Sequence, residues 1–143
     1  MKVIEIRHGD NLLALLIPAN FGPPGIHFVT PNELSQQLAY MNYPPGKVIP
    51  AHVHNAVARE VFFTQETLFV KKGKLRVDFY DAQQQYLESR VLAAGDVILL
   101  IQGGHGFEVL EPLEMIEVKQ GPYAGDMDKT RFVPNLPAQL NIR

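Results

Sequence analysis

The stretch Leu75-Arg76-Val77-Asp78-Phe79-Tyr80-Asp81 alternates apolar and polar residues as far as Tyr80. Successive side chains of a β-strand point to opposite faces, so this pattern predicts a strand with one face on a core and the other facing water. Its register is well specified, because a slip of one residue would expose Leu75, Val77 and Phe79 together. This stretch therefore places the chain among proteins built from β-sheet.

Similar short segments lie on both sides of this strand and are separated by turns that contain glycine or proline. We predict strands over residues 67–70, 97–101 and 115–119, which combine β-branched and aromatic residues with short apolar runs. The opening residues 1–7 also alternate. Residues 38–43 are interpreted as a strand, because a helix would run directly into Pro44 and Pro45.

The connections carry their own signals. Lys71-Lys72-Gly73-Lys74 is interpreted as a solvated hairpin, and Gln83-Gln84-Gln85 as a hairpin tip. Thr30-Pro31-Asn32-Glu33 is a capping-box pattern that predicts a single helical turn. Together these segments predict an all-β, antiparallel sandwich or small barrel with little helix.

Length and composition limit the possibilities further. With 143 residues, of which 46% are hydrophobic, the chain is predicted to form one domain over residues 1–143, with a core barrel at about 38–119. The tail, residues 120–143, is expected to pack on the barrel or on a partner subunit. A net charge of −2 argues against nucleic acid as the main partner. The chain has no cysteine, and the apolar run Leu12–Ile17 is too short to span a bilayer, so we expect a cytoplasmic protein without a membrane partner.

Two of the five histidines form His52-Val53-His54, just after an apparent strand start at Lys47-Val48-Ile49. On a strand, residues two apart share a face, so both imidazoles can meet one divalent metal ion. Glu66 and His105 are candidate third and fourth ligands. Three imidazoles and a carboxylate suit iron(II), manganese, nickel, copper or zinc and leave positions open for water or substrate.

These residues resemble the motifs of the cupins, a family of small metal-binding β-barrels. The first cupin motif, G-x5-H-x-H-x3-4-E-x6-G, is matched by Gly46, His52 and His54, and by Glu66 with Gly73. The second motif is matched in part by Gly95, Gly103 and His105. The resemblance implies a cupin-like jelly roll that binds a divalent metal through His52, His54, Glu66 and His105, and a homodimer.

The chain departs from the cupin pattern in a long insertion and in the second motif, where Ile101 replaces the proline and Val109 the asparagine. Eleven residues, Asn55–Gln65, separate His54 from Glu66 where the family has three or four, and we expect them to form a loop that can act as a lid. Within this loop, Glu60 is an alternative carboxylate ligand. His105 lies one residue closer to its motif glycine than in the family, so Gly103-Gly104 must absorb the difference.

The expected function is metal-assisted chemistry on a small polar molecule in a pocket lined by Leu68, Phe69, Phe107 and Val109. The range of the family favours an isomerase or epimerase acting on a sugar-like compound. An iron-dependent dioxygenase and a non-enzymatic binding or sensor protein are the alternatives. One of the cations Arg59, Arg76, Arg90 and Lys119 can bind an anionic substrate group at the barrel mouth, and residues 121–129 either bind a ligand or form a turn that fixes the tail.

Overall fold

A computed structural model describes all residues, 1–143, and shows a nearly all-β chain. Eight strands are present, and the only helix is the 3-10 turn η1 (Gly125–Met127). The strands are β1 (Ile4–His8), β2 (Asn11–Ile17), β3 (Gly25–Phe28), β4 (Ala39–Asn42), β5 (Glu66–Tyr80), β6 (Tyr86–Ala93), β7 (Val97–Leu100) and β8 (Gly104–Lys119). None of the helical structure is long and apolar enough to cross a membrane. The all-β fold predicted from the sequence is confirmed.

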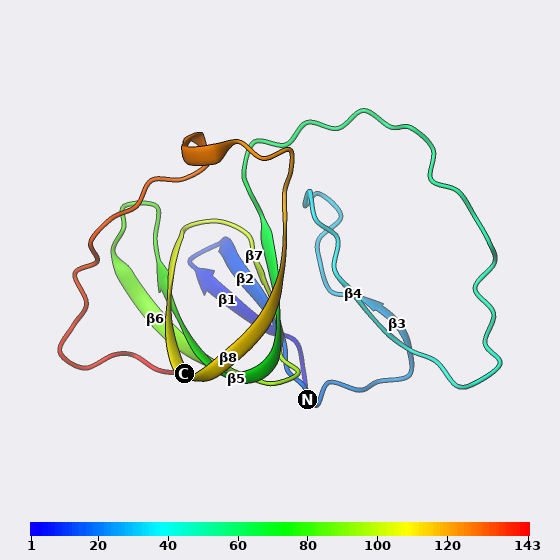
Figure 1. Ribbon diagram of the computed structural model, residues 1–143, viewed down its shortest axis with the longest axis horizontal. Helices are drawn as coiled ribbons and strands as arrows, with labels where there is room; N and C mark the ends of the chain where they lie inside the picture. Colours follow the sequence, from blue (N-terminus) through cyan, green and yellow to red (C-terminus); the bar gives the residue numbers. More distant parts are fainter.

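Six strands form one antiparallel sheet in the order β1-β2-β7-β5-β6, and β8 pairs with β5 along most of its length. The first part of β5 lies between β7 and β8, and its last part lies between β6 and β8. Because β5 and β8 are long and bent, this sheet curls into a half-barrel. Strands β5, β6 and β8 wrap toward β1, β2 and β7 (Figure 1). Strands β3 and β4 form a separate two-stranded sheet.

The hairpin predicted at Lys71–Lys74 is wrong, because β5 continues through these residues. Gly73 has φ +87°, and the register with β8 shifts on both sides of it. A side chain at Gly73 would place its Cβ 2.0 Å from the carbonyl oxygen of Pro112 on β8. The chain therefore bends here instead of turning back. The apolar positions that face the core change from Leu68 and Val70 to Leu75, Val77 and Phe79.

The predicted hairpin tip at Gln83–Gln85 is confirmed between β5 and β6. The Asp81 carboxylate accepts hydrogen bonds from the backbone amides of Gln83 and Gln85, both at 2.9 Å. Gln84 takes the left-handed conformation with φ 66°. An aspartate that holds the turn through its own side chain is the usual chemistry of such tips.

The helical turn predicted at Thr30 is wrong. The Thr30 hydroxyl accepts a hydrogen bond from the amide of Leu38 at 3.1 Å and donates to Gln37 at 2.9 Å. It therefore closes an irregular loop instead of capping a helix, and residues 31–36 form turns and bends. A threonine hydroxyl can accept a hydrogen bond from a helix amide or from an amide elsewhere in a loop, and here it accepts from Leu38.

The inner face of the curled sheet carries the main core. Strands β1, β2, β5, β6 and β7 all contribute to a cluster of 12 buried apolar residues. These are Ile6, Leu13, Ala14, Leu16, Leu68, Val70, Leu75, Val77, Phe79, Leu92, Ile98 and Leu100. A second, smaller cluster of Leu12, Leu15, Leu99 and Ile101 lies against the segment that leads into β4. The core thus joins strands that are distant in sequence.

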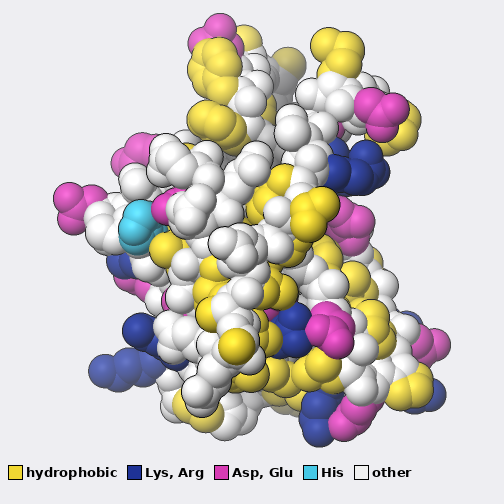
Figure 2. Space-filling view, turned by 90° about the vertical axis from the view of Figure 1, so that its left-hand side faces the viewer, with side chains coloured by type: hydrophobic (Ala, Val, Ile, Leu, Met, Phe, Trp, Pro, Cys, Tyr) yellow, Lys and Arg dark blue, Asp and Glu magenta, His cyan; other side chains and the backbone are white.

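The C-terminal tail packs on the sheet beside β6. The Phe132 ring contacts the Tyr80 ring edge to face, with centroids 5.1 Å apart. Near the end of the chain, the amide of Ser89 donates to the carbonyl of Asn141, and the amide of Arg143 donates to the carbonyl of Ser89. Figure 2 shows the side of the molecule that lies at the left of Figure 1, where apolar side chains gather in the middle of the face and charged ones surround them.

Candidate functional site

The curl of the sheet brings Glu66 and His105 together. Glu66 begins β5 and His105 lies at the start of β8, at opposite ends of the register that pairs these two strands. The bend places both strand starts at the same side of the molecule (Figure 1), and His105 Nε2 lies 3.7 Å from Glu66 Oε2. The side chains are 13% exposed for Glu66 and 30% for His105. The pair therefore lies at the mouth of the half-barrel, partly shielded from water.

Both residues project from the inner face. Glu66 shares that face with buried Leu68, two residues further along β5. His105 is the direct cross-strand partner of buried Phe79, and direct partners in a sheet project to the same side. Phe107 and Val109 follow His105 on the same face and are 41% and 57% exposed. The inner face near His105 is thus open.

The surroundings of Glu66 favour its ionised form. The His105 ring is the main cause of a lowered pKa of the Glu66 carboxyl, and the charges of Lys119 and Lys129 add to it, whereas burial acts in the opposite direction. At 3.7 Å the two atoms are farther apart than in a regular hydrogen bond, so the interaction is mainly electrostatic. An ionised carboxylate beside an imidazole is chemically suited to bind a divalent metal.

The strand predicted to begin at Lys47 and to carry the histidine pair is wrong. Residues 43–65 are irregular and largely exposed, and they extend away from the sheet (Figure 1). Pro44, Pro45 and Pro50 have no amide hydrogen to donate, and no other strand pairs with this segment. The His-x-His segment therefore lacks the neighbour that a strand requires.

His52 and His54 lie next to each other within this segment, with ring centroids 5.3 Å apart. The structure does not bring them to Glu66 and His105, and no group of three or more potential ligands is formed. His52 Nδ1 lies 2.8 Å from the carbonyl oxygen of Pro50, which can only accept a hydrogen bond. A neutral His52 ring thus carries its proton on Nδ1 and leaves Nε2 free to bind a metal. The alternative ligand, Glu60, is exposed in the same segment.

The other residues predicted to line the site divide between the two faces. Leu68, Phe107 and Val109 lie on the inner face, but the expectation for Phe69 is wrong, because it follows Leu68 directly and points to the opposite side. Arg76 binds Asp78 through two hydrogen bonds on the outer face.

The other cations predicted to bind an anionic group, Arg90, Arg59 and Lys119, lie in three different parts of the molecule. Arg90 lies 3.3 Å from Glu88, and the register places both on the inner face. Arg59 is exposed in the irregular segment, while Lys119 lies beside a pocket at the mouth of the half-barrel.

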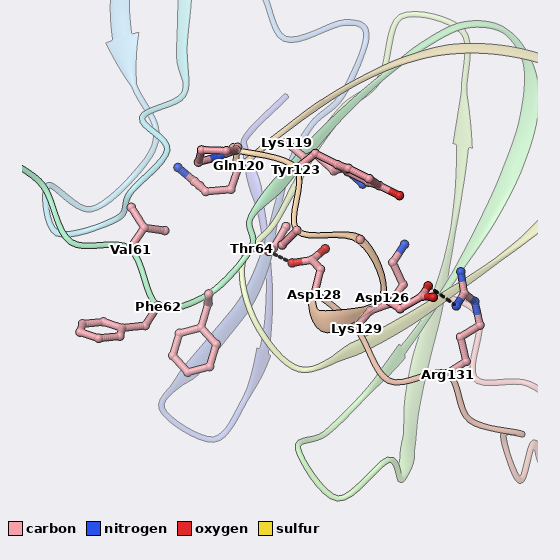
Figure 3. Close-up of a pocket in the computed structure, with 15 residues that line it drawn as sticks. Val61, Phe62, Thr64, Lys119, Gln120, Tyr123, Asp126, Asp128, Lys129 and Arg131 are labelled. Carbon is pink, nitrogen blue, oxygen red and sulfur yellow. Dashed lines mark hydrogen bonds and ion pairs between the residues drawn. The ribbon is translucent and has the colours of Figure 1, made fainter.

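This pocket lies between residues 61–64 and the turn that follows β8 (Figure 3). Lys119, Lys129 and Arg131 line it together with Thr64, whose hydroxyl donates a hydrogen bond to Asp128. From the sequence, residues 121–129 are expected to bind a ligand or to form a turn, and Lys129 does not stand out among them. The concentration of charged residues after Gly121 was the available signal, but only the tertiary structure shows that they face the start of β5.

No family model, curated protein or solved structure matches this chain.

Proposed function

We propose that the protein is a cupin-like, metal-binding protein acting on a small polar molecule, with Glu66 and His105 as the preformed half of the metal site. The contact between these two side chains, 3.7 Å apart on the inner face, is the observation that carries the proposal. They are 39 positions apart in sequence, and the curl of the sheet brings them together. Two ligands are fewer than a protein metal site normally uses.

His52 and His54 would complete the site when residues 47–54 pair along the open edge of β8. That edge has no partner strand, and the inner-face residues Phe107 and Val109 beside it are exposed. The irregular segment in turn exposes Val48, Ile49 and Val53. If the segment pairs with β8 as a strand, the backbone groups of both form hydrogen bonds and the apolar side chains of both become buried. This closure would also complete the jelly roll that the sequence predicts.

In the closed site, the metal would polarise a substrate oxygen or activate water. Glu66 would supply its charge, His105 and the two imidazoles of the histidine pair would fix the geometry, and Phe107 and Val109 would exclude water from one wall. The resemblance favours isomerisation or epimerisation of a sugar-like compound. Oxygen uptake by the iron-loaded protein would instead support the dioxygenase alternative. The homodimer and the cytoplasmic location stay predictions of the sequence.

Zinc binding to the metal-stripped protein, measured by titration calorimetry, tests the site. We expect one equivalent of Zn²⁺ per chain, and we expect His105→Ala and His52→Ala each to weaken binding by about tenfold or more, because each removes one ligand. His8→Ala, which removes an exposed histidine on β1, is the matched control and should bind as the wild type does. Equal zinc affinity in His52→Ala and His8→Ala would refute the four-ligand site.

The closure has its own readout in hydrogen exchange. Backbone amides of residues 47–54 and of β8 should become protected when Zn²⁺ is added, because strand pairing satisfies both edges. Protection limited to the surroundings of Glu66 and His105 would mean that the segment does not pair with β8.

A further inference from the structure

A cavity of about 250 Å³ lies at the end of the half-barrel where β5 begins and β8 ends. Its walls come from the segment that precedes β5 and from the turn that contains η1 (Figure 3). We call it the lysine pocket, defined by Thr64, Lys119, Lys129 and Arg131. Its volume is just below the usual range for ligand sites, so it suits a very small molecule or one group of a larger molecule.

Three cations and two carboxylates line the lysine pocket, Lys119, Lys129 and Arg131 against Asp126 and Asp128, which leaves one net positive charge. Asp128 accepts a hydrogen bond from Thr64, and the fully exposed side chain of Asp126 reaches Arg131 at 4.0 Å. Neither Lys119 nor Lys129 has a carboxylate within ion-pair distance. Two unpaired ammonium groups beside one concave surface concentrate positive potential there, which attracts anions.

The pocket adjoins the candidate metal site. Lys119 is the direct cross-strand partner of Glu66, and the amide of Gln120 donates to the carbonyl of Gln65 at 3.2 Å. A ligand held in the pocket can therefore extend toward Glu66 and His105.

We infer that the lysine pocket binds the oxyanion group, phosphate or carboxylate, of a small ligand, with Lys119 and Lys129 as the side chains that hold it. Ammonium groups donate charge-assisted hydrogen bonds to either kind of oxyanion. The further statement that the rest of the ligand reaches the metal rests on the proposed function. Anion binding by the pocket does not depend on it.

Titration of the protein with inorganic phosphate and, separately, with malonate tests this inference. The titrations are followed by NMR or calorimetry in buffer containing EDTA. We expect Lys119→Gln and Lys129→Gln each to weaken binding by about tenfold, as the loss of one charge-assisted hydrogen bond implies. Lys71→Gln removes the same charge from an exposed, unpaired lysine on β5 and should leave the affinity unchanged. Tighter binding of phosphate or of malonate identifies the class of oxyanion.

Two results would overturn the inference. One is equal anion affinity in Lys129→Gln and Lys71→Gln. The other is phosphate binding that is absent in EDTA, appears only when Zn²⁺ is added in EDTA-free buffer and disappears in His105→Ala, because phosphate would then be a metal ligand. Phosphate binding that persists in His105→Ala, in a protein that binds no zinc, would uphold the lysine pocket while refuting the proposed metal site.

Discussion

At the scale of the residue, Glu66 is the side chain on which both proposals meet. It begins β5, contacts His105, and lies across the strand pair from Lys119. Its charge is favoured mainly by the imidazole, with help from two lysines. A carboxylate held in this way binds cations well, and it also makes the stability of the fold depend on pH.

The sign of that dependence follows from the lowered pKa. Since the pKa of Glu66 is below its ordinary value of 4.5 in the folded protein, its stabilising effect is complete above that value and is lost as the pH falls through the folded pKa. We expect Glu66→Gln to destabilise the protein by roughly 1 kcal/mol at pH 5.5 and much less at pH 3, in urea unfolding with EDTA present. Glu33→Gln, at an exposed carboxylate, is the control; a Glu66→Gln effect of the same size at both pH values would contradict the assignment.

At the scale of the element, the bend in β5 is what makes a half-barrel from a flat sheet. Gly73 provides it through a positive φ and through its close approach to Pro112. β8 follows the same bend, so its two ends reach the same side of the molecule (Figure 1). Without this bend, Glu66 and His105 would lie at opposite ends of a straight strand pair.

Alanine substitutions at Gly73 and Gly25 separate the free-energy cost of a positive φ from the cost of a steric clash with β8. Gly25 has the same φ of +87°, but a Cβ added there meets nothing within 4 Å. We expect Gly25→Ala to cost about 1 to 2 kcal/mol, the usual cost of this backbone region for alanine. Gly73→Ala should cost several kcal/mol more, because its Cβ would overlap backbone atoms of Pro112. Similar unfolding free energies for the two variants, measured in urea, would show that β8 can move away from β5.

At the scale of the whole molecule, the last residues close the fold over a buried polar group. The Ser89 hydroxyl, which is fully buried, donates to Asp78 and contacts the hydroxyl of Tyr86. Asn141 and Arg143 pair with the backbone of Ser89 and cover this network. The C-terminal residues thus supply hydrogen-bond partners for the outer edge of β6, although they are far from β6 in sequence.

Removal of residues 141–143 should therefore destabilise the protein by about 2 to 3 kcal/mol, since two backbone hydrogen bonds and the cover of a buried polar group are lost. The amide of Ser89 should also exchange with solvent much faster. Ile142→Ala keeps the backbone and changes a half-exposed side chain, so its unfolding free energy should stay close to that of the wild type. Equal stability of the truncated and full chains would show that the tail contributes little.

The sequence predicts the β-class and parts of five of the eight strands, namely β1, β4, β5, β7 and β8, because alternation and short apolar runs are local properties of a strand. It also determined the Gln83–Gln85 tip, where Asp81 holds the turn through neighbouring amides. It failed at Lys71–Lys74 and at Lys47–His54. At Lys71–Lys74, the strand bends at Gly73, where the backbone of Pro112 on β8 approaches closely. At Lys47–His54, a strand would need a partner strand, which its own residues cannot specify.

For the candidate site, the residue types were readable from the sequence, and their placement was not. Glu66 and His105 stood out as ligand types, but only the curl of the sheet shows that they meet. Lys129 belongs to a segment that the sequence predicts as a turn, and the structure shows that this segment packs against the residues preceding β5. Contacts of this kind depend on the path of a bent sheet through space. That path is set by long-range packing of the core, which no local pattern of residues records.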